Sequence, residues 1–176
     1  MTTNQAVRLG VLGPLEVQKG GEPVEIAGVE PRAILTMLGL CSGSVVAADV
    51  LVALLWGEDP PPTADEALRN HISALCHTLG DGVVLAEGQG WFLAGSDVDA
   101  ARFRLLVAMG RDASAAGELG DAVACFEEAC TLWRGSPGLP DSPRGLLETT
   151  RWSARHAALV DDRDFALQGV EGADDE

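Results

Sequence analysis

Few side chains in this 176-residue sequence have the types and spacing that catalysis or metal binding requires. His71 and Cys76 lie five residues apart in a segment expected to be helical, so they point about 140° away from each other. A metal ion needs ligands that converge, and we expect no metal site here. Cys125 and Cys130 have the same spacing. No CxxC pair occurs among the four cysteines, and we expect small reduced thiols packed in the core.

Phosphate-binding and nucleophile motifs are also missing from the sequence. Gly88 and Gly90 lack the third glycine of a dinucleotide fingerprint, and they follow an expected hairpin strand. No P-loop, HExxH motif or nucleophile elbow occurs. We therefore expect no cofactor, we assign no catalytic residue, and we regard an enzyme as the less favoured class of function.

A single helix over 63–79 is expected to position the candidate recognition residues. Thr63 and Glu66 have the spacing of a capping box, and Gly80 is a typical C-terminal stop. Apolar side chains recur at helical spacing and are expected to pack into the core; they are Leu68, Ile72, Leu75 and Leu79. The remaining face is therefore available for contact.

The outer face of this helix holds our candidate contact residues for DNA or a partner, which are Arg69, Asn70, Ser73 and His77. Arg69 can contact a phosphate or pair with Asp65 four residues earlier. A hairpin follows, with strands near 83–85 and 91–93, and its turn offers Glu87 and Gln89 as wing residues. The alternative for both segments is a solvated surface without a partner.

The order of elements predicts an α+β winged helix-turn-helix domain over 1–96. An all-α, helical-repeat-like domain over 97–170 and an acidic, frayed tail over 171–176 follow. An N-terminal hairpin is expected from strands within 8–17 and 23–26, and all strand pairs are expected to be antiparallel. Helices are expected over 32–40 and 49–57, with Pro31 at the first helical position, and then over 100–116, 119–133 and 143–167.

The charge of the chain opposes contact with polyanions. Twelve basic residues stand against 27 acidic ones, which gives a net charge of −15 at pH 7. A field of that sign repels phosphate backbones and anionic membranes. No apolar run reaches the ~18 residues of a membrane span, and the N-terminus does not read as a signal peptide. We expect a cytoplasmic protein without membrane contact.

Several motifs, in this order, resemble the Streptomyces antibiotic regulatory proteins, the SARP-type transcriptional activators. They are RLGVLGPLEV at 8–17, LLWGEDPPPTA at 54–64, LGDG at 79–82, GWFL at 90–93, DAARF at 99–103 and LWRG at 132–135. The resemblance implies a winged helix whose recognition helix is 63–79, followed by a bacterial transcriptional activator domain. That second domain is longer in the family, so the chain is expected to be a truncated member.

The sequence departs from the family where DNA would be contacted. Positions that match the family's recognition arginines read Ala74, Cys76 and His77, Glu30 precedes the first helix, and Glu87 stands at the wing. Residues 1–96 contain four cations and eleven acids. Phosphate neutralisation supplies much of DNA affinity. We therefore expect DNA binding that is weak or absent, favoured by acid through histidine and lost steeply with salt.

Our main hypothesis is a SARP-like regulatory protein of a secondary-metabolite biosynthetic cluster that acts through a partner. The alternative is a regulator fold recruited to small-molecule or protein binding, or to catalysis in a pocket between the two domains. A protein partner or homodimer is expected, because missing helices would uncover apolar surface. Val107, Leu132, Trp152 and Leu159 are candidates for a homodimer contact or for packing against the winged helix.

Overall fold

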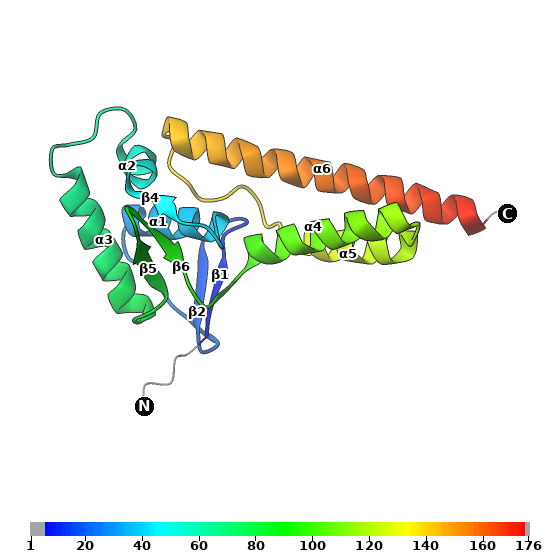
Figure 1. Ribbon diagram of the computed structural model, residues 1–176, viewed down its shortest axis with the longest axis horizontal. Helices are drawn as coiled ribbons and strands as arrows, with labels where there is room; N and C mark the ends of the chain where they lie inside the picture. Colours follow the sequence, from blue (N-terminus) through cyan, green and yellow to red (C-terminus); the bar gives the residue numbers. More distant parts are fainter. Residues whose placement is uncertain (1–5, 175–176) are drawn as a thin grey trace.

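In the computed structural model, which describes residues 6–174, all strands and the first three helices gather at one end. Three further helices extend from them as an arm (Figure 1). This arrangement confirms the expected α+β winged helix followed by helices. The boundaries given above between the domains and the tail stay predictions.

The first sheet has four strands, whereas the sequence analysis expected a two-stranded hairpin. The expected strand within 8–17 is divided between two antiparallel strands, the expected strand within 23–26 is reduced to residues 22–23, and the strand at 96–98 was missed. The sheet has the order β3-β2-β1-β7, from β1 (Val7–Gly10), β2 (Glu16–Lys19), β3 (Glu22–Pro23) and β7 (Ser96–Val98). β7 pairs parallel to β1, with Leu9 opposite Val98, and both side chains are buried. The expectation of antiparallel pairs alone was therefore wrong, because β7 returns the chain to β1 and buries Val98 in the same core.

The three helices of the winged-helix domain are α1 (Val29–Leu40), α2 (Ala48–Trp56) and α3 (Ala64–Leu79). Every residue of α1 from 33 to 40 is buried, so this helix forms the centre of the domain. Pro31 is its third residue rather than its first, a place where a missing N–H group still costs no helical hydrogen bond.

The start of α3 differs from the expected capping box. Thr63 has φ −96° and ψ 10° and makes no side-chain cap hydrogen bond. The Ala64 N–H group instead donates to the Pro61 carbonyl at 2.9 Å, so a turn from the proline run leads directly into the helix. Gly80 ends α3 with φ 102°, as expected.

A second, three-stranded sheet forms the wing beside α3. Its order is β4-β6-β5, from β4 (Val46–Ala47), β5 (Val84–Glu87) and β6 (Gly90–Leu93). The expected hairpin is present as β5 and β6, and the short strand β4 pairs with β6 on its other side. A Cβ on Gly90 would lie 2.3 Å from the Val46 carbonyl oxygen, so this close strand approach needs glycine.

The helical arm consists of α4 (Asp99–Ala116), α5 (Leu119–Leu132) and α6 (Pro143–Asp174). Gly117 ends α4 in the left-handed conformation and turns the chain into α5. α6 lies along this pair (Figure 1). It is longer than expected, so residues 171–174 are helical rather than frayed, while residues 175–176 lie outside the described part.

Large side chains that we expected at an interface instead fill the core of the arm. Trp152 is 1% exposed and meets Phe103 edge-to-face at 5.9 Å, and Leu159 is fully buried. The homodimer expectation is therefore wrong for these two residues. Val107 and Leu132 are partly buried against the same core. Exposed large apolar residues of the arm are instead Leu105, Met109, Leu146, Leu147 and Phe165.

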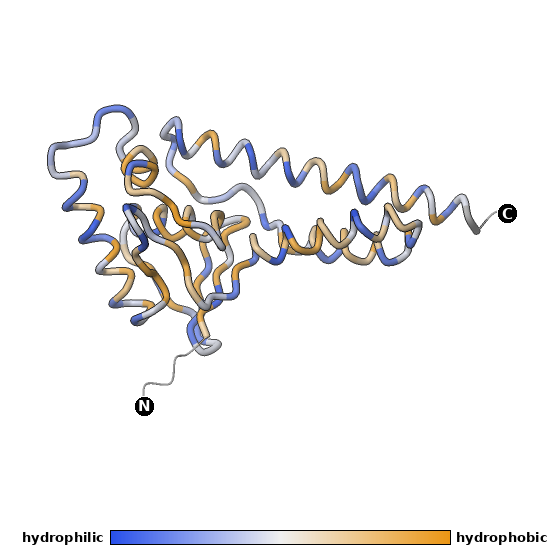
Figure 2. Tube along the Cα trace, viewed as in Figure 1, coloured by the Kyte–Doolittle hydropathy of each residue, from blue (hydrophilic) through white to orange (hydrophobic). Residues whose placement is uncertain are grey.

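Polar and apolar positions alternate along all three arm helices (Figure 2). Within residues 6–174, no helix combines the length and the apolar character that a bilayer span needs.

Candidate nucleic-acid or partner interface

The outer face of α3 carries the candidate contact residues as the sequence predicts. The four stripe residues are at most 6% exposed, while Arg69, Asn70, Ser73 and His77 lie on the exposed side. α3 itself lies at the outer edge of the winged-helix domain, away from the arm (Figure 1). The helix therefore presents these four side chains together, with the short side chain of Ala74 between them.

The charges on this face are mostly negative. Asp65 and Glu66 stand in the first turn of α3, where the helix dipole stabilises them. The same helix end would otherwise attract a phosphate. Among residues 6–174, Arg69 takes part in no ion pair, so the hypothetical pair with Asp65 is not formed. Arg69 is thus a single available cation on an acidic face.

A groove of about 500 Å³ lies between α2, α3 and the wing. Asp49, Asp65 and Arg69 line it, together with Gln89 and Trp91. The Ala48 N–H group donates to the Gln89 carbonyl at 2.8 Å and holds the wing against the start of α2. The groove thus presents two carboxylates and one guanidinium.

The wing tip adds another acid to the same side. Glu87 and Gln89 are both exposed, on either side of Gly88, whose φ of 58° forms the turn. Neither side chain makes a hydrogen bond among the described residues. The tip therefore offers one carboxylate and one amide for contact, and no cation.

Cys76, on the inner side of the same helix, is a packed thiol. Its Sγ donates to the Val84 carbonyl at 3.6 Å, and burial, followed by the nearby Asp81 carboxylate, raises the pKa of the thiol. A raised pKa makes a cysteine a weaker nucleophile at neutral pH. All four cysteines are free and only partly buried, which is less burial than the sequence analysis expected.

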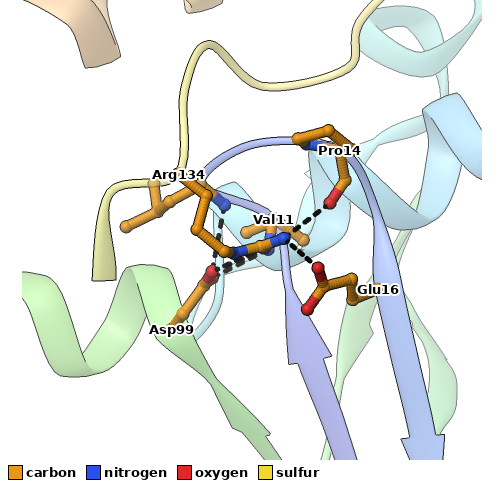
Figure 3. Close-up of polar contacts among 6 residues, drawn as sticks. Val11, Pro14, Glu16, Asp99 and Arg134 are labelled. Atoms are coloured by element: carbon orange, nitrogen blue, oxygen red, sulfur yellow. Dashed lines mark hydrogen bonds and ion pairs between the residues drawn. The ribbon is translucent and has the colours of Figure 1, made fainter. Parts of the chain in front are cut away.

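The most connected polar group lies elsewhere, where the arm joins the first sheet (Figure 3). Asp99, the first residue of α4, accepts hydrogen bonds from the backbone N–H groups of Val11 at 2.9 Å and Leu12 at 3.0 Å. The Arg134 guanidinium donates to the Pro14 carbonyl at 3.0 Å and pairs with Glu16 at 2.7 Å. It also reaches Asp99 at 3.4 Å. We call these six residues, Val11, Leu12, Pro14, Glu16, Asp99 and Arg134, the junction cluster.

Two glycines make room for this cluster. A Cβ on Gly10 would lie 2.4 Å from Nη2 of Arg134, and a Cβ on Gly13 would lie 2.8 Å from the Arg134 Cβ. The motifs at 8–17, 99–103 and 132–135 therefore meet at one place. Sequence reasoning missed this cluster because its partners are up to 120 residues apart. The available signal was the set of motifs itself, whose polar members, Asp99 and Arg134, had no assigned purpose.

Two further contacts fix the arm to the winged-helix domain. The Ser142 hydroxyl, just before α6, donates to the Leu54 carbonyl at 2.7 Å. Arg104 of α4 donates to the carbonyl oxygens of Leu40 at 3.1 Å and Ser42 at 2.6 Å. The acceptors are carbonyl oxygens near the C-terminal ends of α2 and α1, which have no partner within their own helices. Three separate groups of hydrogen bonds thus fix the arm to the winged-helix domain, and α3 packs against α1 and α2 of that domain.

Comparison with known proteins agrees with this architecture. Residues 98–169 match the family model of the bacterial transcriptional activator domain. The regulatory protein AfsR of Streptomyces coelicolor is 35% identical over 133 residues, 74% of this chain. The transcriptional regulatory protein MoaR1 of Mycobacterium tuberculosis is 35% identical over 143 residues, 76% of this chain. The chain belongs to the SARP family of transcriptional regulators.

The fold of this SARP-family chain also matches a solved relative. Mycobacterium tuberculosis EmbR, determined in complex with a low-affinity phosphopeptide, superposes with a TM-score of 0.71 at 29% identity. That match covers 92% of the present chain and 44% of EmbR. The chain corresponds to 46% of MoaR1 and 13% of AfsR, so it spans about half the length of these relatives or less.

Proposed function

We propose that this SARP-family chain regulates transcription of a secondary-metabolite gene cluster in the cytoplasm, through a protein partner rather than through tight DNA binding of its own. The observation that carries the proposal is the exposed face of α3, which presents two first-turn carboxylates and a single guanidinium. Relatives are transcriptional regulatory proteins, which supports a role in transcription.

The electrostatic argument concerns the number of phosphate contacts. Each neutralised phosphate releases counterions, and each lost contact of this kind costs about 1 kcal/mol of affinity. Ala74 and His77 stand where the family's helix carries arginines, and residues 1–96 hold four cations against eleven acids. The winged-helix domain is thus expected to bind DNA only weakly at physiological salt.

Adding cations to α3 tests whether this face still meets DNA. The variant Ala74→Arg with His77→Arg should raise affinity for duplex DNA and steepen the salt dependence by about two contacts. The matched control is Ala154→Arg with Ala157→Arg, which adds the same charge to exposed positions of α6. Mobility shifts over a range of salt concentrations would measure both. Tight, sequence-specific binding by the unmodified chain at about 150 mM salt would contradict the proposal.

Removing acidic side chains from α3 distinguishes a protein partner from DNA, because the two contacts predict opposite changes in transcriptional output. In the variant Asp65→Asn with Glu66→Gln, two charges disappear with little change in size. A DNA contact would gain affinity and transcriptional output, whereas a partner with a basic surface would lose its charge complement. We expect lower output from a reporter in the producing cell. Asp112→Asn with Asp161→Asn, both exposed on the arm, serves as the control. Higher output would contradict a partner that binds this face.

A role in small-molecule binding has one observation in its favour, an open cleft between the first sheet and the arm. Thr131 is the single hydroxyl-bearing residue of its lining, and its Oγ1 already donates to the Glu128 carbonyl at 2.7 Å. The lining thus offers charged groups for binding and no activated nucleophile, which favours a ligand site over an active site.

A further inference from the structure

The cleft beside the junction cluster has the size of a metabolite site. Its volume is about 310 Å³, at the lower end of the range found for small-molecule pockets. The floor is formed by β1 and β2, and the wall by the start of α4 and the end of α5. A ligand in this place would contact both the winged-helix domain and the arm.

Three guanidinium groups line the cleft, from Arg8, Arg102 and Arg134. Arg8 and Gly10 project from the same face of β1, because side chains alternate along a strand. The Arg134 guanidinium lies over Gly10, where a Cβ would come within 2.4 Å of its Nη2. The absence of a side chain at Gly10 therefore leaves room for the Arg134 guanidinium, which comes from the segment after α5, to lie at the floor of the cleft on the same face of β1 as Arg8.

The charge balance of the cleft differs from that of the chain. Three of the twelve cations line it together with three of the 27 acids, so it is neutral within a protein of net charge −15. The field of the whole chain repels anions, and saturable anion binding therefore requires donors that converge. Guanidinium groups meet this need, because they bind carboxyl and phosphoryl oxygens in bidentate geometry.

Two of the three arginines form ion pairs with exposed carboxylates that another anion could replace. Arg8 pairs with Asp97 at 3.0 Å, with side chains 68% and 57% exposed. Arg102 pairs with Glu128, and both of these side chains are also about half exposed. Exposed ion pairs contribute little, so these carboxylates can turn into water when another acceptor enters. Arg134 is 29% exposed and is held from several sides by the junction cluster, which makes it a fixed donor.

We propose that the cleft binds a small metabolite with a phosphoryl or carboxyl group. Arg134 supplies the fixed donor, and Arg8 and Arg102 close on the anion from β1 and α4. Because the lining belongs to both parts of the molecule, the bound anion strengthens the contact between the sheet and the arm. The site thereby provides a small-molecule input at the junction between the first sheet and the arm, and its use in regulation rests on the proposed function.

Calorimetric titration of the full chain at constant ionic strength tests the site with two probes, inorganic pyrophosphate and citrate. Saturable binding of at least one probe is expected. Arg8→Ala with Arg102→Ala should weaken it at least ~10-fold. Arg111→Ala is the matched control, since Arg111 is a 55% exposed arginine of α4 paired with Asp162 outside the cleft. The affinity of the Arg111→Ala variant for the probe should equal that of the unmodified chain.

The outcomes show separately whether the site exists and which class of anion it binds. Binding of pyrophosphate alone assigns a phosphoryl ligand, binding of citrate alone a carboxyl ligand, and binding of both a general oxyanion site. No saturation up to about 10 mM of either probe overturns the proposal, as does undiminished binding by the double variant. If that variant does not fold, amide NMR of the unmodified chain decides. Probe-induced shifts at Gly10 and Thr131 support the site, and shifts confined to α3 refute it.

Discussion

The junction cluster gives the most direct test of how the arm is attached. In Asp99→Ala, the backbone N–H groups of Val11 and Leu12 lose their acceptor in a place where the Asp99 side chain is only 12% exposed. An unpaired buried donor costs about 1–3 kcal/mol. Arg134 loses only its 3.4 Å contact and keeps Glu16 and Pro14, so it adds little.

The expected loss is therefore about 3 kcal/mol, a large share of the about 5–15 kcal/mol by which a protein of this kind is stable. Urea unfolding followed by tryptophan fluorescence would show it as a fall of roughly 1 M in the midpoint. Asp99→Asn keeps an acceptor oxygen and should lie between the alanine variant and the unmodified chain.

The matched control is Asp97→Ala, two residues earlier. Asp97 pairs with Arg8 in an exposed ion pair, and such a pair contributes about 0–1 kcal/mol. Equal destabilisation by Asp97→Ala and Asp99→Ala would refute the reasoning, because the two residues would then act through charge and not through the two backbone donors.

Three other predictions concern the arm. Trp152→Ala should destabilise the chain by about 3–5 kcal/mol in urea unfolding, since Trp152 is 1% exposed and packs on Phe103. Gly110→Ala should cost about 1–3 kcal/mol because its Cβ would lie 2.4 Å from Phe126, whereas Gly120→Ala, with open space around it, should stabilise α5 by up to about 1 kcal/mol. His156 stacks on Trp133 at 4.6 Å, and burial and then Arg163 lower the pKa of this imidazole. Just below pH ~6.5 the unfolded chain then binds more protons than the folded chain, so stability decreases as the pH is lowered through that window. On going from pH ~7 to ~5.5, the unfolding midpoint of His156→Gln should therefore decrease less than that of the unmodified chain.

Elements with a clear period were predictable from the sequence. The stripe of α3 follows from four apolar residues at helical spacing, and all four are buried. The hairpin of β5 and β6 follows from apolar runs on either side of a glycine turn. In both cases neighbouring residues carry the information, and the long-range packing agrees with the local preference.

Elements whose partner lies far along the chain were not predictable in this way. β7 is three residues long and has no alternation to distinguish it from a linker, and its pairing with β1 joins residues 89 positions apart, such as Leu9 and Val98. Trp152 was expected on a bare face because a domain shorter than the family's was expected to uncover apolar surface. Phe103 of α4 covers it instead, and a tertiary contact of this kind cannot be read from the period of α6.

The division between predictable and unpredictable features also bears on function. Asp99 and Arg134 satisfy backbone groups and ion pairs that attach the arm, so their removal changes the fold before it changes anything else. Asn70, Ser73 and His77 are exposed and make no side-chain hydrogen bond among residues 6–174. Nothing in the packing of α3 therefore requires a particular charge on its outer face. The attachment of the arm can therefore persist while the charge of the α3 face changes, and on our proposal the fold and the affinity for DNA can separate in this way.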